Sequence, residues 1–250
     1  MDALERALGA VAGFVWGPPM LVLLFGTHLY LTGRLRFVQR YVGLGIRLSL
    51  RRAPEGRGDV SQFGALTTAL AATIGTGNIV GVATAIAAGG PGAVLWMWLT
   101  GVFGIATKYA EAVLAVKYRV RTAAGTMAGG PMYVLERAMN ARRLATFFAI
   151  VTTITALGAG NMVQANSIAT LLESGYGVPP WISGGLLTLA TGVVLIGGIR
   201  SIAAVCERLI PFMASWYVTG CLLLLVIGWR TIPDCLALIV GSAFSGQAAL

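Results

Sequence analysis

The chain has 250 residues, of which 57% are hydrophobic and only 11% are charged, and its 18 basic and nine acidic residues give a net charge of +9. Because soluble domains carry about 25% charged residues, this composition excludes a soluble enzyme, a disordered tail and a disulfide-rich secreted module. The basic residues fall in short blocks between apolar stretches, which is typical of membrane topology and not of a nucleic-acid-binding face. We therefore expect an integral membrane protein that lies in a lipid bilayer and binds no nucleic acid.

A helix needs about 20 apolar residues to cross the roughly 30 Å hydrocarbon core of a bilayer. Strand-type alternation is absent, and the apolar stretches are much longer than the strands of a membrane barrel. The sequence therefore predicts an all-α membrane protein with six transmembrane helices. These expected spans cover residues 8–31, 63–88, 92–115, 146–172, 181–199 and 210–229.

The Lys and Arg residues alternate from one connecting segment to the next. Successive connections hold seven, zero, six, zero and two of them. They are Arg34, Arg36, Arg40, Arg47, Arg51, Arg52 and Arg57, then Lys117, Arg119, Arg121, Arg137, Arg142 and Arg143, and finally Arg200 and Arg208. Because connections rich in Lys and Arg stay in the cytoplasm, we expect a multi-pass protein of the cytoplasmic membrane with its N-terminus outside.

Two segments outside the expected spans have their own patterns. Residues 35–52 place apolar side chains on one helical face and arginines elsewhere, which predicts an amphipathic helix on the cytoplasmic leaflet within a segment covering 34–60. Residues 125–133 are rich in glycine and predict a turn, followed by a short amphipathic helix through Met139.

The second expected span is interrupted near its middle by Gly75 and Gly77, beside threonines and Asn78. An interrupted helix survives in a membrane only where it lines a cavity or packs on protein, because unsatisfied backbone groups there cost several kcal/mol. We therefore expect a break between Thr73 and Asn78. One interpretation is a transporter site, in which the two helix ends bind a cation and an anionic group. The other is a packing surface of small residues that lets helices approach closely.

The fourth expected span has a polar stripe. At 100° per residue, Thr153, Gly160, Gln164 and Ser167 share a narrow arc, Asn161 lies next to it, and Asn166 points to the opposite side. Polar side chains in the hydrocarbon zone should face the interior of the bundle, so Gln164 is expected to face the break. The alternative role of such a stripe is hydrogen bonding between helices, which is worth about 0.6 kcal/mol per contact.

Several blocks of the sequence strongly resemble the alanine or glycine:cation symporter family. They are ATIGTGNIVGVATAIAAGGPGA at 72–93, WMWLT at 96–100, ATKYAE at 106–111, GGPMY at 129–133 and GNMVQANS at 160–167. The family is similar in fold to LeuT-type transporters, which are built from two inverted five-helix repeats. By this resemblance, residues 1–33 form an extra leading transmembrane helix, residues 61–230 form the first repeat with a broken span, and residues 231–250 begin the connection to a second repeat.

The resemblance also implies a binding site. Backbone N–H groups around Gly75, Thr76 and Gly77 would hold a substrate carboxylate, and Gln164 would contact the substrate from the fourth span. The carbonyls of Ala71 and Ile74 would form half of a Na⁺ site. The full set of implied substrate-binding residues is Thr73, Gly75, Thr76, Gly77, Asn78, Asn161 and Gln164, of which Thr73 and Asn78 match positions that form another cation site in some relatives.

By the same resemblance, we expect sodium-coupled symport of alanine or glycine by alternating access, with this chain supplying the first half of the transporter. Na⁺ is the expected coupling ion, with no cofactor. An enzyme is not expected, because the sequence lacks H-E-x-x-H and G-x-S-x-G motifs. Family members are much longer, so the alternative hypothesis is a transport-inactive membrane fragment or an assembly subunit, in which the glycines serve packing only.

Overall fold

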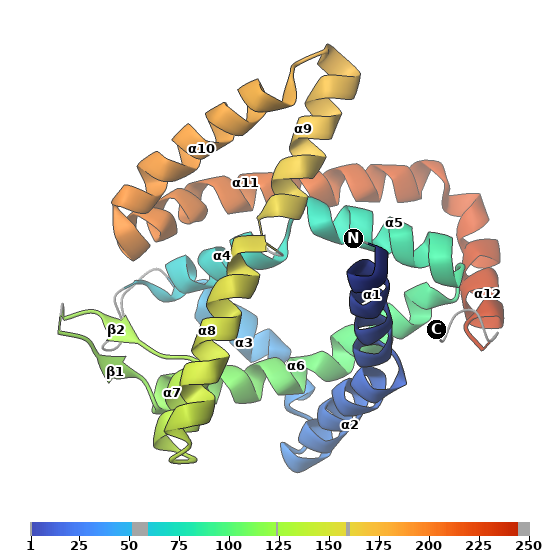
Figure 1. The fold of residues 1–250 in the computed structure, drawn as a ribbon. Coiled ribbons are helices and arrows are strands. Elements are labelled where there is room, and N and C mark those ends of the chain that lie inside the picture. Colours follow the sequence, from blue (N-terminus) through green and yellow to red (C-terminus); the bar gives the residue numbers. More distant parts are fainter. Residues whose placement is uncertain (1, 52–59, 124, 159–160, 245–250) are drawn as a thin grey trace. The chain divides into compact units, whose positions relative to one another are not determined.

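The structure is a computed structural model, which describes residues 2–51, 60–123, 125–158 and 161–244 (Figure 1). The chain divides into two compact units, and each boundary between them falls inside a helix. Unit 1 comprises Met1–Gly43, Thr84–Leu114 and Pro233–Leu250, and unit 2 comprises Leu44–Ala83 and Ala115–Ile232.

Unit 1 is built mainly from four helices, three of which are joined by contacts of Trp96. Its helices are α1 (Asp2–Trp16), α2 (Pro18–Arg34), most of α6 (Ala93–Lys117), and α12 (Ile232–Ser242). The short turn η1 (Val38–Tyr41) also belongs to unit 1. The Trp96 indole N–H donates to the Ala243 carbonyl at 2.8 Å, and its ring lies edge-on to Phe25 and Phe244. The leading span thus consists of two helices rather than one, because Gly17 precedes two prolines that begin α2.

Unit 2 contains most of the other helices and a short hairpin. In chain order these are most of α3 (Val42–Ser49), α4 (Gln62–Thr73), the first part of α5 (Thr76–Gly89), β1 (Val120–Arg121), β2 (Met127–Ala128), α7 (Pro131–Arg137), α8 (Arg142–Gly158), α9 (Met162–Tyr176), α10 (Pro180–Ile196), α11 (Gly198–Ile227) and η2 (Trp229–Thr231). Helix α11 packs most extensively against α4 and also contacts α10, which in turn contacts α9 (Figure 1). The buried residues of α4 and α11 are small or branched: Gly64, Thr67, Ala203 and Ile210.

The described helices are long and apolar enough for four membrane spans, or five if the bent pair α4 and α5 counts as one. The fifth expected span, 181–199, corresponds to α10, which is apolar but only 17 residues long. The connection expected to hold Arg200 and Arg208 is helical. The chain turns at Gly197 and Gly198, and α11 begins directly at Gly198, so both arginines lie inside α11. The expectation of a loop there was wrong.

The two segments outside the spans fold partly as expected. The predicted amphipathic helix over 35–52 is a 3₁₀ turn followed by α3, because Arg36 and Phe37 adopt positive φ and interrupt the helix; Arg52 lies outside the described residues. The glycine-rich turn leads into α7 as expected, with Pro131 at its first position. The antiparallel pair β1–β2 was not expected, since each strand has only two residues.

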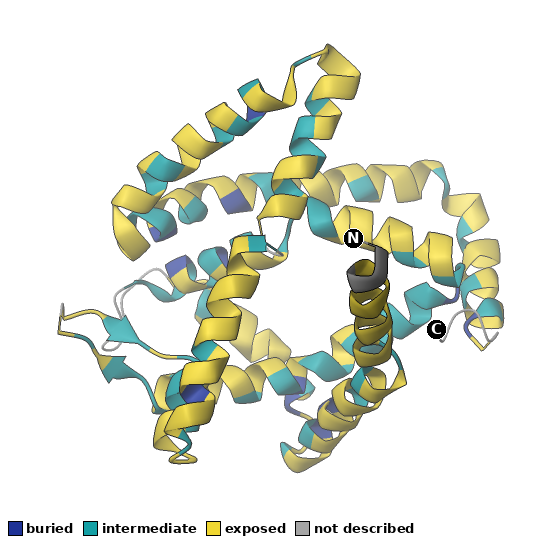
Figure 2. Cartoon of the chain, in the orientation of Figure 1, coloured by how far each residue is buried: buried dark blue, intermediate teal, exposed yellow. Residues whose placement is uncertain are grey.

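Many residues of the described helices are exposed (Figure 2). Many exposed side chains are large and apolar, such as Trp216 at 77% and Ile196 at 90% exposure. Isolated soluble proteins rarely expose apolar surface on this scale. The helices therefore present their apolar faces to lipid or to further protein.

Candidate functional site

The second expected span breaks where the sequence predicted. Helix α4 ends at Thr73, Ile74 is extended with φ −90° and ψ 110°, and α5 begins at Thr76. The last hydrogen bond of the first helix joins the Ile74 N–H to the Leu70 carbonyl at 2.7 Å. The axes of the two helices differ by 42°. The prediction of a break between Thr73 and Asn78 is therefore confirmed.

The polar side chains beside the break hold its two ends together. The Asn78 side-chain amide donates to the Thr73 carbonyl at 2.6 Å, reaching back from the first turn of α5 to the last turn of α4. The Thr73 hydroxyl donates within its own helix, to the Ala69 carbonyl at 2.7 Å. One of the carbonyls left free at the end of α4 is thus satisfied by a side chain. This role of Asn78 was missed by sequence reasoning, which grouped it with the ligand-binding residues.

Other backbone groups at the break keep their hydrogen-bonding capacity. Within the described part of the chain, the carbonyls of Ala71 and Ile74 accept no backbone hydrogen bond, and the N–H groups of Thr76 and Gly77 donate none. A helix C-terminus carries a partial negative charge and a helix N-terminus a partial positive charge. The break therefore offers acceptors for a cation and donors for an anion.

Gln164 of α9 lies against the break. The Thr76 hydroxyl donates to Gln164 Oε1 at 3.3 Å. A Cβ atom added at Gly75 would lie 2.8 Å from Gln164 Nε2 and 3.0 Å from Cδ, and would also collide with Oε1. Gly75 does not adopt a positive φ, so a side chain here would meet the Gln164 amide and not backbone strain. The prediction that Gln164 faces the break is confirmed, and the contribution of the Thr76 hydroxyl is an addition to it.

The other polar residues of the predicted stripe are not brought to the break by any described contact. Asn161 is exposed at the N-cap position of α9 and makes no side-chain capping bond there. Asn166 is exposed, and Ser167 donates to the Val163 carbonyl within α9. Gly160 lies outside the described residues, and the expected fourth span is described as α8 and α9 on either side of it.

The segments that form the break and carry Gln164 have no charged side chain. No Asp, Glu, Lys or Arg occurs at 60–107 or at 144–172, the segments that supply α4, α5 and the part of α9 around Gln164. A bound charge would therefore be compensated by helix ends and by the Gln164 amide. Such a site suits a ligand with no net charge that carries both an anionic and a cationic group, together with a small cation.

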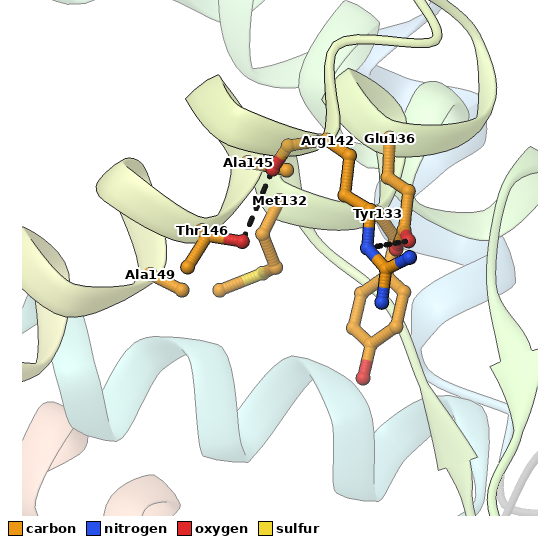
Figure 3. Close-up of a pocket in the computed structure, with 7 residues that line it drawn as sticks. All are labelled: Met132, Tyr133, Glu136, Arg142, Ala145, Thr146 and Ala149. Atoms are coloured by element: carbon orange, nitrogen blue, oxygen red, sulfur yellow. Dashed lines mark hydrogen bonds and ion pairs between the residues drawn. The ribbon is translucent and has the colours of Figure 1, made fainter.

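A separate pocket is lined by residues of α7 and α8 (Figure 3). Glu136 and Arg142 stand at its side, with 3.8 Å between Oε1 and Nε. Met132, Tyr133, Ala145, Thr146 and Ala149 complete its lining. None of the predicted site residues belongs to this pocket, so it is not the candidate site.

Comparison with known proteins identifies relatives along the whole chain. The sodium:alanine symporter family matches residues 1–250. The sodium/alanine symporter AgcS of Methanococcus maripaludis is 48% identical over 248 residues, which cover 96% of this chain and 55% of that protein. An uncharacterized transporter of Haemophilus influenzae is 49% identical over 249 residues, covering 99% of this chain and 55% of the relative. A probable sodium/glutamine symporter of Bacillus subtilis is 34% identical over 249 residues, covering 98% and 52%. The chain spans about half the length of these relatives.

Proposed function

Since this chain belongs to the sodium:alanine symporter family, we propose that the full-length protein couples the entry of Na⁺ to the uptake of a small neutral amino acid, alanine or glycine. Members of this family are transporters and not enzymes. The family assignment and the apolar helices make it an integral membrane protein. Na⁺ serves as the coupling ion, and the transport requires no cofactor. We further propose that the chain supplies the first half of a LeuT-type transporter with six spans, in the cytoplasmic membrane with its N-terminus outside.

The observation that carries this proposal is the charge-free break between α4 and α5 with Gln164 against it. An amino acid is a zwitterion, so it needs one group of donors and one group of acceptors within a few ångströms. In the proposed site the N–H groups of Gly75, Thr76 and Gly77 hold the carboxylate at the N-terminus of α5. The amide of Gln164 contacts the bound amino acid from α9.

The cation is placed at the other helix end. The carbonyls of Ala71 and Ile74 provide oxygen ligands, which are the ligands that hard cations such as Na⁺ prefer, and the partial negative charge at the end of α4 adds to their effect. These two carbonyls make an incomplete coordination shell. The remaining ligands would come from the other half of the transporter.

The contacts of the remaining predicted residues suggest different roles. Thr73 and Asn78 bridge the break through the bond between the Asn78 amide and the Thr73 carbonyl, and we assign them to holding the two half-helices together. Because no described contact brings Asn161 to the break, it is left out of the proposed site.

Transport follows if the site opens to one side of the membrane at a time. Occupation of the Na⁺ half-site fixes the end of α4, which favours the arrangement that binds the amino acid. The break permits α4 to move relative to α5 without breaking hydrogen bonds inside either helix. The coupling is therefore a preference of both ligands for the same arrangement of the two half-helices.

The test of this function is uptake of radiolabelled amino acids into proteoliposomes that contain the full-length protein. Alanine, glycine and glutamine are compared with an inward Na⁺ gradient and with K⁺ in its place. We expect accumulation of alanine or glycine only with the Na⁺ gradient. Equal uptake with K⁺ would contradict Na⁺ coupling, and preferred uptake of glutamine would contradict the small substrate.

A further inference from the structure

The N-terminus of α4 is joined to α11 through two side chains. Ser61 caps α4, because its hydroxyl oxygen accepts from the Gly64 N–H at 2.9 Å. The same hydroxyl donates to Glu207 Oε1 of α11 at 2.8 Å. The carboxylate of Glu207 is thus linked to the first turn of α4 through its cap.

Gly64 is the residue that allows this approach. A Cβ atom there would lie 2.5 Å from Glu207 Oε1, 3.1 Å from the Ser61 hydroxyl and 3.5 Å from Glu207 Cδ. Gly64 is itself buried. The carboxylate therefore occupies the space that any side chain at position 64 would fill.

Glu207 belongs to the face of α11 that packs on α4. Ala203 and Ile210, four residues before and three after it, are buried at 4% and 6% exposure, and Thr67 on α4 is only 1% exposed. The α4–α11 contact is the most extensive between any two described elements, and the helices lie side by side (Figure 1). A carboxylate within an otherwise small and apolar interface favours a specific partner, here the capped and partly positive end of a helix.

We propose that Glu207 is a positioning residue for transport, whose carboxylate holds the capped end of α4 against α11 and thereby sets how readily this half-helix separates from α11. This inference rests on the proposed function, in which α4 moves about its break. The contact lies at one end of α4, and the Na⁺ half-site lies at the other. Releasing the contact would let the whole 12-residue helix tilt, so that the carbonyls of Ala71 and Ile74 leave their binding position.

The direct test measures the exposure of the interface. Thr67→Cys is introduced into the full-length protein after Cys206, Cys221 and Cys235 and any other native cysteines are replaced, and its rate of alkylation is measured without Na⁺ or amino acid. We expect Glu207→Ala and Ser61→Ala each to raise this rate roughly tenfold, the size of effect that loss of a charge-assisted hydrogen bond has on an equilibrium. Glu207→Gln keeps an acceptor for the Ser61 hydroxyl and should raise the rate less.

Two further variants distinguish this contact from general damage. Gly64→Ala should raise the rate as Glu207→Ala does, because the new methyl group displaces the carboxylate, and it should have a smaller additional effect when combined with Glu207→Ala. Glu173→Ala removes an exposed carboxylate of α9 and is the matched control, for which no change is expected.

The transport readout follows the same order. Glu207→Ala should raise the Na⁺ concentration for half-maximal alanine uptake several-fold, and Glu207→Gln should restore most of the loss. Unchanged alkylation in Glu207→Ala and Ser61→Ala proteins that melt like the parent would overturn the inference, as would an equal increase in Glu173→Ala. Because alkylation requires no transport, a protein that shows the expected alkylation but no Na⁺-driven uptake would refute the proposed function and leave the contact between α4 and α11 established.

Discussion

Replacing Gly75 by alanine gives the sharpest test of the proposed site. The added Cβ would lie 2.8 Å from Gln164 Nε2 and 3.0 Å from Cδ, which is closer than carbon atoms approach in folded proteins, so the Gln164 side chain must move. The amide sits at the end of a flexible side chain, so the fold should survive. Its displacement should cost the bound amino acid one hydrogen bond to a charged group, about 1.5–3 kcal/mol, or roughly 10- to 150-fold in the Kd for alanine.

Alanine binding to the purified full-length protein is measured by calorimetry, with the melting temperature of each variant as a check of folding. Gly81→Ala is the matched control, because a Cβ atom there would meet no atom within 4 Å. Since the effect of Gly75→Ala acts through Gln164, the double variant with Gln164→Ala should lose little more affinity than the weaker-binding single variant. Wild-type affinity in Gly75→Ala, or fully additive losses in the double variant, would refute this reasoning.

Three other substitutions test different parts of the structure. Gln164→Ala should weaken alanine binding by about 1–3 kcal/mol, roughly 5- to 150-fold, whereas Asn166→Ala should have little effect. Equal losses of affinity in calorimetry would show that the wrong face of α9 was assigned to the site. Gly92→Ala should lower the free energy of unfolding by about 1–3 kcal/mol in thermal or denaturant melts, because its Cβ would lie 2.5 Å from the Ala243 backbone nitrogen. An unchanged free energy of unfolding would show that the packing around Gly92 is loose. Arg47→Ala, on the exposed face of α3, should leave alanine affinity unchanged and act at most on membrane insertion, which expression and fractionation would show.

The part of the fold that could be predicted from sequence was the part specified by long, uniform composition. Apolar stretches of helical length marked the main helices, and glycines beside hydroxyl and amide groups marked the break after Thr73. The face of α9 that carries Gln164 followed from helical periodicity alone. These inferences need only local geometry, which the sequence specifies directly.

Features that depend on single residues at helix ends were harder to predict. Gly197 and Gly198 complete a turn so short that α11 begins at once and includes Arg200, which the pattern of basic residues had placed in a loop. The paired prolines at the start of α2 divide the leading span, although its composition is apolar throughout.

Contacts between helices were also beyond the sequence. The bond between the Asn78 amide and the Thr73 carbonyl depends on the bend of the chain at Ile74. The contact of Ser61 with Glu207 joins residues 146 positions apart. A signal existed in each case, namely a capping serine before α4 and an acidic residue in an apolar helix, but neither reveals its partner.

In the proposed function, the break between α4 and α5 binds an amino acid whose uptake is driven by Na⁺. The measurement that tests it most directly is uptake of radiolabelled alanine by proteoliposomes that contain the full-length protein or its Gly75→Leu variant. We expect accumulation against a gradient in the parent protein only when Na⁺ is higher outside. We expect none in Gly75→Leu, whose side chain would fill the space that Gln164 occupies beside the break. Na⁺-driven accumulation by a correctly folded Gly75→Leu protein would contradict it.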